Sequence, residues 1–155
     1  MPLHFRSMDE LKYNDFIEKL VAEYAGEHIK AGTWDPEEAH GLAQSQIQQL
    51  VPEGLGTSGH RFFIALDKSE PVGSVWLNIQ PREKKKQAFI FDLKIEEQQQ
   101  GKGYGKAIMA ALDEYAKAEN FEKIALHVFA HNERALKLYQ TMGYEIKSYN
   151  MEKRF

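Results

Sequence analysis

Gln100-Gly101-Lys102-Gly103-Tyr104-Gly105 is the stretch that decides the fold, because of the two elements that flank it. Before it, residues 88–95 are apolar on both faces until Asp92, which predicts a central strand. After it, apolar residues recur at helical spacing from about 103 to 119. A glycine-rich turn between a strand and a helix exposes unpaired backbone N–H groups at the positive end of the helix dipole. The stretch therefore predicts an anion-binding loop.

The spacing of the glycines narrows the class of phosphate ligand. A dinucleotide-binding fingerprint, G-x-G-x-x-G, would need a third glycine where the chain has Lys106. No segment of the sequence matches the nucleotide-binding loop G-x-x-x-x-G-K-[ST]. What remains is Q-x-x-G-x-G over residues 100–105, with Lys102 and Lys106 adding positive charge. Taken alone, this spacing also fits a tight turn that binds no ligand.

A second block follows after one more strand. Residues 123–129 predict that strand, and Asn132 can cap a helix that Gly143 ends. The inner face of this helix is expected to contain Ala135, Leu138, Tyr139 and Met142. By itself the block describes a capped amphipathic helix, in which Tyr139 is a core aromatic residue.

Together the two blocks resemble the GNAT acetyltransferases. The first matches that family's Q-x-x-G-x-G loop, and residues 132–144 match its N-x-x-A-x-x-L-Y-x-x-x-G-[FY] block, in the family's order. The resemblance extends from about Phe62 to the C-terminus. It implies an α/β (α+β) fold with a central, mostly antiparallel mixed sheet of about six to seven strands. About four helices flank this sheet, which is splayed at the acetyl-CoA site.

The first sixty residues predict two helices. Ser7, with Glu10 three residues later, forms a capping box and predicts that the first helix is capped by Ser7. Residues 32–34 break that helix, and Asp35-Pro36 starts a second one that ends near 51–52. The apolar residues at helical spacing in the first helix are Tyr13, Phe16, Ile17, Leu20, Val21 and Tyr24.

The rest of the chain predicts strands. Residues 61–66 and 72–79 are strand-like, and residues 144–155 are expected to form one or two closing strands. The charged run 82–86 is short and has no interleaved aromatic residues, so it indicates a solvated hairpin turn rather than a nucleic-acid patch. Because neither a repeat nor a linker interrupts the pattern, residues 1–155 are expected to form one acetyltransferase domain.

The family resemblance implies an N-acetyltransferase that moves the acetyl group of its co-substrate, acetyl-CoA, to an amine by direct attack. The strand end before the glycine loop would bind the pantetheine arm, and the loop would bind the pyrophosphate. Tyr139 would act as the general acid for the leaving thiolate. The cofactor-binding residues so implied are Leu93, Lys94, Ile95, Gln100, Gly101, Lys102, Gly103, Tyr104, Gly105, Lys106 and Asn132.

The general base is less well defined by the sequence. Some family members carry a glutamate at the position that is Phe89 here, so this chain departs from that pattern. Asp92 is the nearby carboxylate, but its parity along the strand is opposite to that of Phe89 and predicts the other face of the sheet. His127 could titrate near neutrality, although such a residue can also be purely structural. Proton loss through water is the default expectation, and a non-catalytic acyl-CoA-binding module with this fold is the alternative function.

Composition and charge limit the kinds of site and partner that this chain can have. The 155 residues include no cysteine, which excludes disulfides, thiolate zinc sites and a cysteine nucleophile, and no metal site is expected. No apolar run is long enough for a signal peptide or a membrane span, so a cytoplasmic protein without a membrane partner is expected. The net charge of −3 argues against a nucleic-acid partner. The expected assembly is a monomer or a homodimer.

The charge is unevenly distributed along the chain. Residues 1–60 hold ten Asp and Glu residues against four Lys and Arg, whereas residues 61–155 have a net positive charge. We therefore expect a cationic acceptor, either a small-molecule amine or a peptide amine, beside the N-terminal helices. The carboxylates that motivate this prediction are Glu23, Glu27, Asp35, Glu37 and Glu38, with Trp34 offering a ring face to a cation. Solvated helix faces are the alternative interpretation of the same charges.

Overall fold

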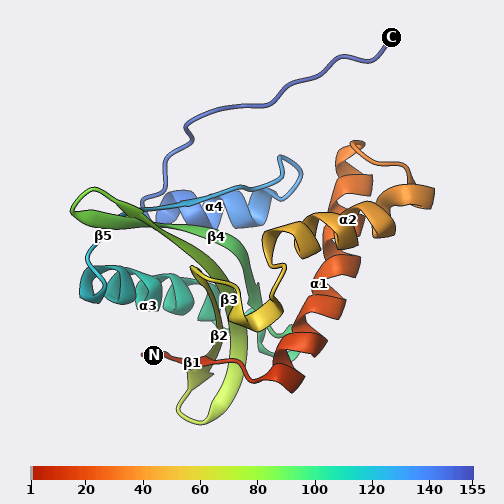
Figure 1. The fold of residues 1–155 in the computed structure, drawn as a ribbon. Coiled ribbons are helices and arrows are strands. Elements are labelled where there is room, and N and C mark those ends of the chain that lie inside the picture. Colours follow the sequence, from red (N-terminus) through yellow and green to blue (C-terminus); the bar gives the residue numbers. More distant parts are fainter. Residues whose placement is uncertain (1) are drawn as a thin grey trace.

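A mixed sheet of five strands runs through the chain in the computed structural model, which describes residues 2–155 (Figure 1). The strands lie in the order β1-β2-β3-β4-β5; the first three pairs are antiparallel and the β4–β5 pair is parallel. Their bounds are β1 (His4–Ser7), β2 (His60–Asp67), β3 (Glu70–Arg82), β4 (Lys85–Ile95) and β5 (Phe121–Leu126). The prediction of a mostly antiparallel mixed sheet is confirmed, although with five strands in this part of the chain rather than six to seven.

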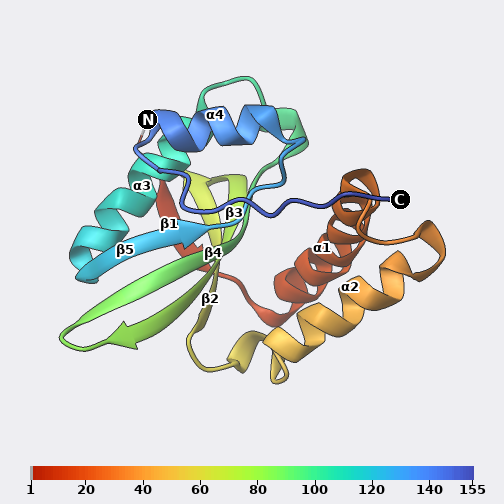
Figure 2. The same ribbon diagram turned by 90° about the horizontal axis from the view of Figure 1, so that it is seen from above.

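Four α-helices flank the sheet, as expected. They are α1 (Glu10–Ala31), α2 (Pro36–Leu50), α3 (Tyr104–Ala118) and α4 (Glu133–Thr141), with two short 3-10 helices, η1 (Gly54–Gly56) and η2 (Glu97–Gln99). Seen from above, α1 and α2 lie on one side of the sheet, and α3 and α4 lie on the other (Figure 2). Within residues 2–155, no helix is long and apolar enough to cross a membrane.

Each face of the sheet has its own hydrophobic core. On the α1–α2 face, Phe62 and Trp76 stack with ring centroids 5.2 Å apart and contact the apolar side of α1. On the opposite face, the α3 residues Ile108, Met109 and Leu112 are fully buried against the strands. The alternation of apolar side chains along β2 and β3 supplies both cores, since successive residues of a strand point to opposite faces.

The start of α1 differs from the prediction. Asp9, not Ser7, is the N-cap, and its Oδ1 accepts the backbone N–H of Lys12 at 2.8 Å. Ser7 belongs to β1, where it pairs with Phe63, and the next residue, Met8, donates its N–H to the Phe62 carbonyl at 2.9 Å. Pairing with β2 therefore holds Ser7 in extended backbone and moves the helix start to Glu10.

The C-terminal segment also differs from the prediction. Residues 144–155 form no strand, and Figure 1 shows this segment rising away from the body beyond α4. The Tyr144 N–H still bonds to the Tyr139 carbonyl at 2.9 Å, but Tyr149 and Met151 are largely exposed. The expected closing strands are therefore absent, and this segment does not pair with the free edge of β5.

A β-bulge in β4 changes which side chains face α1. Trp76 of β3 lies opposite Asp92, whereas the next pair joins Leu77 to Ile90, so Phe91 is the extra residue. Directly paired residues share a face, which places Asp92 beside Trp76 on the α1–α2 side. The parity count from Phe89 predicted the other face and is wrong, because it did not include the extra residue.

Candidate active site

The sheet opens between β4 and β5. Their parallel pairing ends at Ile90 and Leu126, whereas β4 continues to Ile95 with only β3 as its partner. The backbone of Leu93, Lys94 and Ile95 that faces away from β3 is therefore free of strand pairing. This opening is the splay that the fold prediction contained, and it lies where the sequence placed the pantetheine arm.

Gly73 fixes how closely β3 approaches this opened part of β4. A Cβ atom added to Gly73 would lie 2.4 Å from the Lys94 carbonyl oxygen, which is too short for a contact between these two atoms. Gly73 pairs with Ile95, at the end of the ladder. Because Gly73 has no side chain, β3 can pair closely with the last residues of β4, which have no partner on their β5 side.

The glycine loop connects η2 to the start of α3 and presents backbone N–H groups. Gly101 and Gly103 adopt left-handed backbone with φ of +78° and +86°, a conformation that favours glycine. Gly103 is the N-cap of α3 and supplies no side-chain cap. Because the helix ladder starts with the bond from Ala107 N–H to the Gly103 carbonyl, the preceding N–H groups of the first turn point out of the helix end. This geometry suits an anion.

Side-chain hydrogen bonds connect the glycine loop to the β2–β3 turn. The buried Gln99 donates to Glu70 Oε1 at 2.9 Å and accepts from Lys102 Nζ at 3.2 Å. The Tyr104 hydroxyl donates to Asp67 Oδ2 at 2.7 Å. The ammonium group of Lys102 is therefore directed at Gln99 rather than freely placed over the loop.

Two further loop residues have structural contacts. Gly105 lies against α4, where an added Cβ would be 3.1 Å from Leu138 Cδ2, so this glycine allows the two helices to pack closely. Gln100 donates to the Ile95 carbonyl at 3.3 Å. Lys106 is exposed and can add positive charge at the loop. Asn132 caps α4 as predicted, with its Oδ1 accepting from Ala135 N–H at 3.4 Å.

Tyr139 lies on α4, half-buried against the core of the α3 face. Burial raises the pKa of its hydroxyl above the ordinary value of 10.0, and the negative charge of Asp92 raises this pKa further. Tyr139 therefore keeps its proton at neutral pH, which a proton donor requires.

Asp92 is the carboxylate nearest to this chemistry. Its Oδ2 atom is buried, and no group within residues 2–155 donates a hydrogen bond to it. Burial raises the pKa of Asp92 from 3.8 to about 7; the charge of Lys94 opposes this shift and that of Glu23 adds to it. Lys94 and Glu23 form an ion pair of 2.7 Å beside it, which joins β4 to α1. A carboxylate with this pKa can accept a proton at neutral pH.

His127 follows the end of β5 and is exposed, so the predicted strand 123–129 is shorter than expected at this end. Its ring contacts Phe129 at 5.0 Å between centroids. Sequence reasoning missed a second histidine, His28 of α1, whose ring stacks on Trp34 at 3.8 Å and meets Phe129 edge-on at 5.1 Å. His28 lies four residues after Tyr24, so the helical spacing could have indicated that it continues the apolar side of α1.

His28 has an unusual environment. Its Nδ1 contacts the Thr33 hydroxyl, whereas its Nε2 is buried and finds no partner in the described part of the chain. Burial lowers the pKa of His28, and the neighbouring His127 lowers this pKa further. The connection after β5 and the end of α1 are thus brought together by aromatic rings, and His131 Nε2 lies 2.5 Å from Glu27 Oε2.

The five carboxylates expected near the acceptor separate into two groups. Glu23 and Glu27 of α1 contact Lys94 of β4 and His131 of the connection after β5, respectively. Asp35, Glu37 and Glu38 lie at the exposed start of α2, where they suit the helix dipole. One face of Trp34 is covered by His28, which reduces the ring surface available to a cation.

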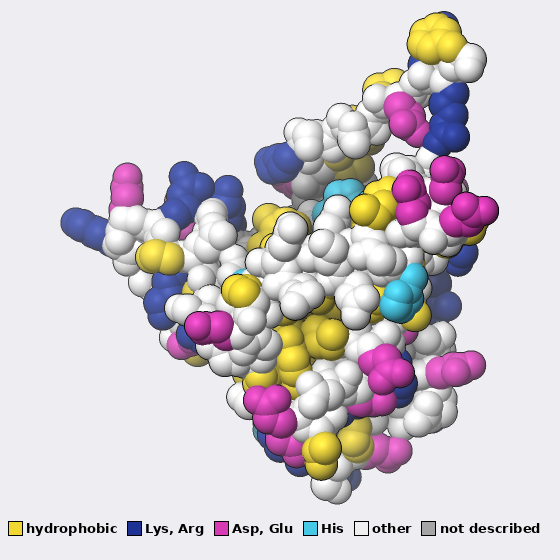
Figure 3. All heavy atoms as spheres, turned by 45° about the vertical axis from the view of Figure 1, so that its right-hand side comes forward, with side chains coloured by type: hydrophobic (Ala, Val, Ile, Leu, Met, Phe, Trp, Pro, Cys, Tyr) yellow, Lys and Arg dark blue, Asp and Glu magenta, His cyan; other side chains and the backbone are white. Residues whose placement is uncertain are grey.

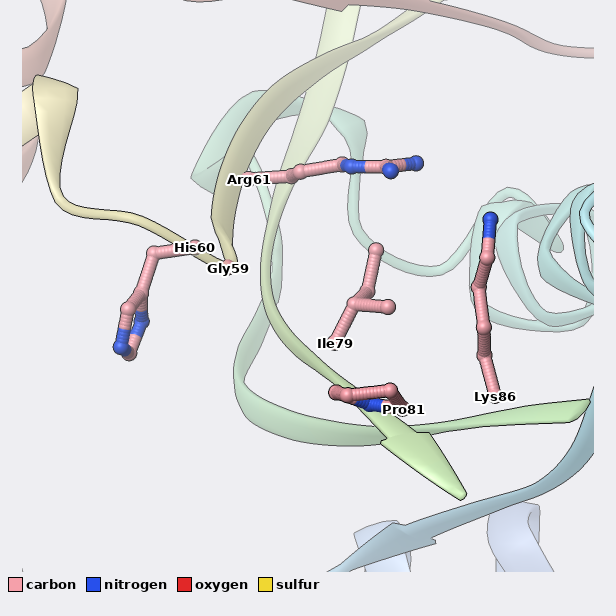
Figure 4. A pocket seen from close by; sticks show the side chains of 6 residues that line it. All are labelled: Gly59, His60, Arg61, Ile79, Pro81 and Lys86. Carbon is pink, nitrogen blue, oxygen red and sulfur yellow. The ribbon is translucent and has the colours of Figure 1, made fainter. Parts of the chain in front are cut away.

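Two hollows lie away from this opening. One is formed at the far end of the sheet by residues that include Arg61 and Lys86 (Figure 4). The other is a groove between α1 and α2 whose lining includes Tyr13, Ile17 and Ile47, and Figure 3 shows hydrophobic side chains at its base. Neither hollow includes the glycine loop, Tyr139 or Asp92 in its lining. The opening between β4 and β5 is thus the candidate active site.

Comparisons with known proteins agree with this geometry. The sequence profile of the acetyltransferase (GNAT) family matches residues 17–144. The uncharacterized N-acetyltransferase YycN of Bacillus subtilis (strain 168) is 36% identical over 155 residues, covering 99% of each chain. YdgE of the same organism, also an uncharacterized N-acetyltransferase, is 36% identical over 154 residues, covering 99% of this chain and 98% of its own. The crystal structure of YycN superposes with a TM-score of 0.94 at 35% identity, covering 99% of this chain and 98% of YycN.

Proposed function

This chain belongs to the GNAT acetyltransferase family, and we propose that it transfers the acetyl group of acetyl-CoA to an amine by direct attack on the thioester carbonyl. The observation that carries the proposal is the opening between β4 and β5, where β4 has no partner beyond Ile90 and the buried Oδ2 of Asp92 has no hydrogen-bond partner among the described residues. Residues 1–155 then act as one acetyltransferase domain. The full-length match to YycN supports this extent.

The donor site is proposed to use backbone groups. Leu93, Lys94 and Ile95 offer backbone groups on the side of β4 that has no neighbouring strand to the amide-rich pantetheine arm; the Ile95 carbonyl already accepts from Gln100. The first turn of α3, with the loop from Gln100 to Lys106, binds the pyrophosphate through N–H groups and the helix dipole. Asn132, at the N-cap of α4, would also contact the arm.

An amine with a pKa of about 10.4 in water is mostly protonated at neutral pH and has no lone pair, so it must first lose one proton to solvent through water before it can attack. The nitrogen must lose a second proton once it has bonded to carbon, and one proton must reach the sulfur. The C–N bond forms, the C–S bond breaks, and the proton on nitrogen passes to Asp92, directly or through water. The Tyr139 hydroxyl gives its proton to the thiolate and recovers one from solvent. His127, which is exposed near the same opening, is the alternative proton carrier.

The acceptor is proposed to be cationic, either a small-molecule amine or the amine of a basic peptide. Glu23 and Glu27 support this assignment, because both lie on the side of α1 that faces the opening. Each is already paired, so their attraction for an incoming ammonium group is a long-range effect rather than a direct contact.

A panel assay tests the proposal. Thiol release from acetyl-CoA should be measured with polyamines, aminoglycosides, amino acids and basic peptides, with the Tyr139→Phe variant as the control. We expect release with at least one cationic amine and a much lower rate in the variant. Phe89, which stands where some family members have glutamate, favours a second candidate, a non-catalytic acyl-CoA-binding module. Tight acetyl-CoA binding by calorimetry with no release for any amine would support that module instead.

A further inference from the structure

The imidazole ring of His28 is enclosed by aromatic side chains at the end of α1. Trp34 stacks on it with centroids 3.8 Å apart, and the rings of Tyr24 and Phe129 stand nearly perpendicular to it at 4.6 Å and 5.1 Å. Phe129 belongs to the connection between β5 and α4, which reaches toward this end of α1 in Figure 2. His28 therefore lies on the proposed acceptor side, in a position that three neighbouring rings fix.

Thr33 decides which nitrogen of this ring carries the proton. The Thr33 hydroxyl contacts His28 Nδ1 and also donates to the His28 carbonyl at 3.2 Å. Because a hydroxyl has a single proton, its oxygen accepts the contact from Nδ1, which must then carry a hydrogen. Burial lowers the pKa of His28, and His127 lowers it further, so the neutral ring predominates at pH 7. The hydrogen-bond network thus assigns the lone pair of the neutral ring to Nε2.

His28 Nε2 is therefore a buried hydrogen-bond acceptor, and no group among residues 2–155 donates to it. An acceptor in this state has lost its hydrogen bonds to water without a replacement, which costs stability. A donor that is not part of the described chain would remove this cost. Trp34 and Phe129 lie in connections rather than in a helix or strand, and both are half-buried. A rotation of either ring can therefore open a path from solvent to Nε2.

Asp92 Oδ2 is the other buried side-chain atom that lacks a partner in the described chain. It lies near Lys94, whose ammonium group binds Glu23 of α1 at 2.7 Å. His28 follows Glu23 by five residues, which is a rise of about 7.5 Å along the helix. This spacing matches Asp92 and His28 to two separate donors of one acceptor molecule, the reacting amine at Asp92 and a second group at His28.

We propose that His28 determines acceptor specificity: its Nε2 atom accepts a hydrogen bond from a second N–H or O–H group of the acceptor, several bonds away from the reacting amine. The proposal rests on the acetyl transfer proposed above and narrows the amines that this chain favours. An acceptor without the second donor would leave Nε2 buried and unpaired, and a site of this kind discriminates strongly against such an analogue. The favoured acceptor is thus bifunctional, like an amino alcohol, a diamine or a peptide.

Two amines that differ only at their far end test this specificity. Aminobutanol ends in a hydroxyl group, whereas pentylamine has a methyl group in its place, and both carry one positive charge. We expect kcat/KM for aminobutanol to exceed that for pentylamine by about tenfold or more in the wild type, because the hydroxyl supplies the donor that Nε2 lacks.

Substitutions at His28 assign this preference to Nε2. His28→Phe keeps an aromatic ring beside Trp34 but has no nitrogen, so the preference should fall to about twofold or less. His28→Gln can place its amide oxygen near the position of Nε2 and should retain a preference of about fivefold. Tyr24→Phe is the matched control, because it alters another ring that packs on His28 and should keep the full preference. The dissociation constant of acetyl-CoA should be unchanged in all three variants.

Nitrogen NMR of the histidine rings tests the same contact without turnover. In protein saturated with CoA, which carries no acetyl group, Nε2 of His28 should resonate as a nitrogen with a lone pair. Adding aminobutanol should move this resonance toward that of a hydrogen-bonded nitrogen, whereas pentylamine should not. The signal is identified among the six histidines by its loss in His28→Gln.

The outcomes separate this inference from the proposed reaction. A shifted Nε2 resonance without thiol release for any amine would overturn the acetyl transfer but keep the role of His28. A protonated Nε2 in the free protein, or a resonance that moves with neither aminobutanol nor any amine of the panel, would overturn the role of His28. Equal kcat/KM for the two amines in the wild type, or an unchanged preference in His28→Phe, would also overturn it and leave the acetyl transfer standing.

Discussion

The two faces of the sheet contribute to the site in different ways. On the α3–α4 face, the proposed donor site uses the loop 100–106 before α3 and Asn132 at the N-cap of α4, each of which forms within one local turn and helix. On the α1–α2 face, the proposed acceptor side combines α1, β4 and the connection after β5, which are far apart in the chain. A loop that binds a donor through its backbone can therefore be encoded by one short stretch of sequence, whereas the position of a proton acceptor depends on long-range strand pairing.

The two faces also differ in their electrostatics. The donor loop offers N–H groups and two glycines with positive φ. In the chain as described, the buried side-chain atoms without a hydrogen-bond partner are Asp92 Oδ2 and His28 Nε2, and both lie toward α1. An unpartnered buried polar atom costs about 1–3 kcal/mol, so such atoms are expected where function requires them. Substitutions on each face can therefore separate proton transfer from donor binding.

The largest effect is expected for Asp92→Asn, which keeps the shape of the side chain and removes the proton acceptor. We expect kcat/KM at pH 8 to fall by about 10²–10³-fold, because general base catalysis typically contributes 10²–10⁴-fold. In the wild type, kcat/KM should rise with pH up to about 7, the pKa of Asp92, and this rise should be lost in the variant. Asp113→Asn, which changes a half-buried carboxylate of α3, is the control and should keep both rate and pH profile.

Asp92→Asn should have the opposite effect on stability. The folded state raises the pKa of Asp92 from 3.8 to about 7, so the folded chain holds this proton more tightly than the unfolded chain. The stability that Asp92 contributes is therefore greatest below pH 3.8 and is lost as the pH rises to about 7. Asp92→Asn should raise Tm at pH 8 and change it little at pH 4. Equal Tm differences at the two pH values would show that Asp92 ionises freely in the folded chain.

The next largest effect is expected for Tyr139→Phe, on the opposite face. The ring and its packing remain, but the hydroxyl, whose raised pKa keeps it protonated, is lost. We expect kcat to fall by about 10²-fold with little change in the dissociation constant of acetyl-CoA, because the proton is needed only as the thiolate leaves. A kcat within about twofold of the wild type would show that water protonates the sulfur.

The face of the sheet on which Asp92 lies could not be predicted from the sequence. The strand, the loop and both motif helices are predicted by local periodicity and capping, and the structure confirms them. The face of Asp92 depends on one extra residue, Phe91, which arises from the register between β3 and β4. Strand register is decided by long-range pairing, so a parity count along one strand cannot detect a bulge.

Strand pairing also explains why the predictions for the start of α1 and for residues 144–155 differ from the structure. Ser7-x-x-Glu10 is a sound local signal for a cap, but pairing of Ser7 with Phe63 holds it in β1 and leaves Asp9 to cap the helix. The last twelve residues have the composition of a strand, but they pair with no other strand in the structure. Both predictions from local preference were wrong, because strand pairing, which the local sequence does not encode, decides the outcome.

A further prediction tests the proposed donor loop. Gly103→Ala places a Cβ atom where φ is +86°, which strains the backbone at the N-cap of α3 and reorients the N–H groups there. Gly143→Ala is the matched control, because Gly143 has a similar φ of +96° and lies at the end of α4, outside the loop. By calorimetry, we expect acetyl-CoA affinity to fall by about tenfold for Gly103→Ala and to change little for Gly143→Ala. Equal affinities for the two variants would remove the loop from the donor site.

The smallest effect is expected from the charges on the acceptor side. Glu27→Gln removes a charge that faces the opening, whereas Glu37→Gln removes an equal charge from the exposed start of α2. For a cationic acceptor, KM should rise by about two- to threefold in the first variant and remain unchanged in the second, because exposed charges act weakly at a distance. Salt should raise the wild-type KM as the Debye length shrinks from about 10 Å at 0.1 M to about 3 Å at 1 M, and this rise should be flatter in Glu27→Gln. If both variants respond alike, the acidic N-terminal helices act only through their total charge, and a best substrate that is neutral or anionic would remove the cationic acceptor altogether.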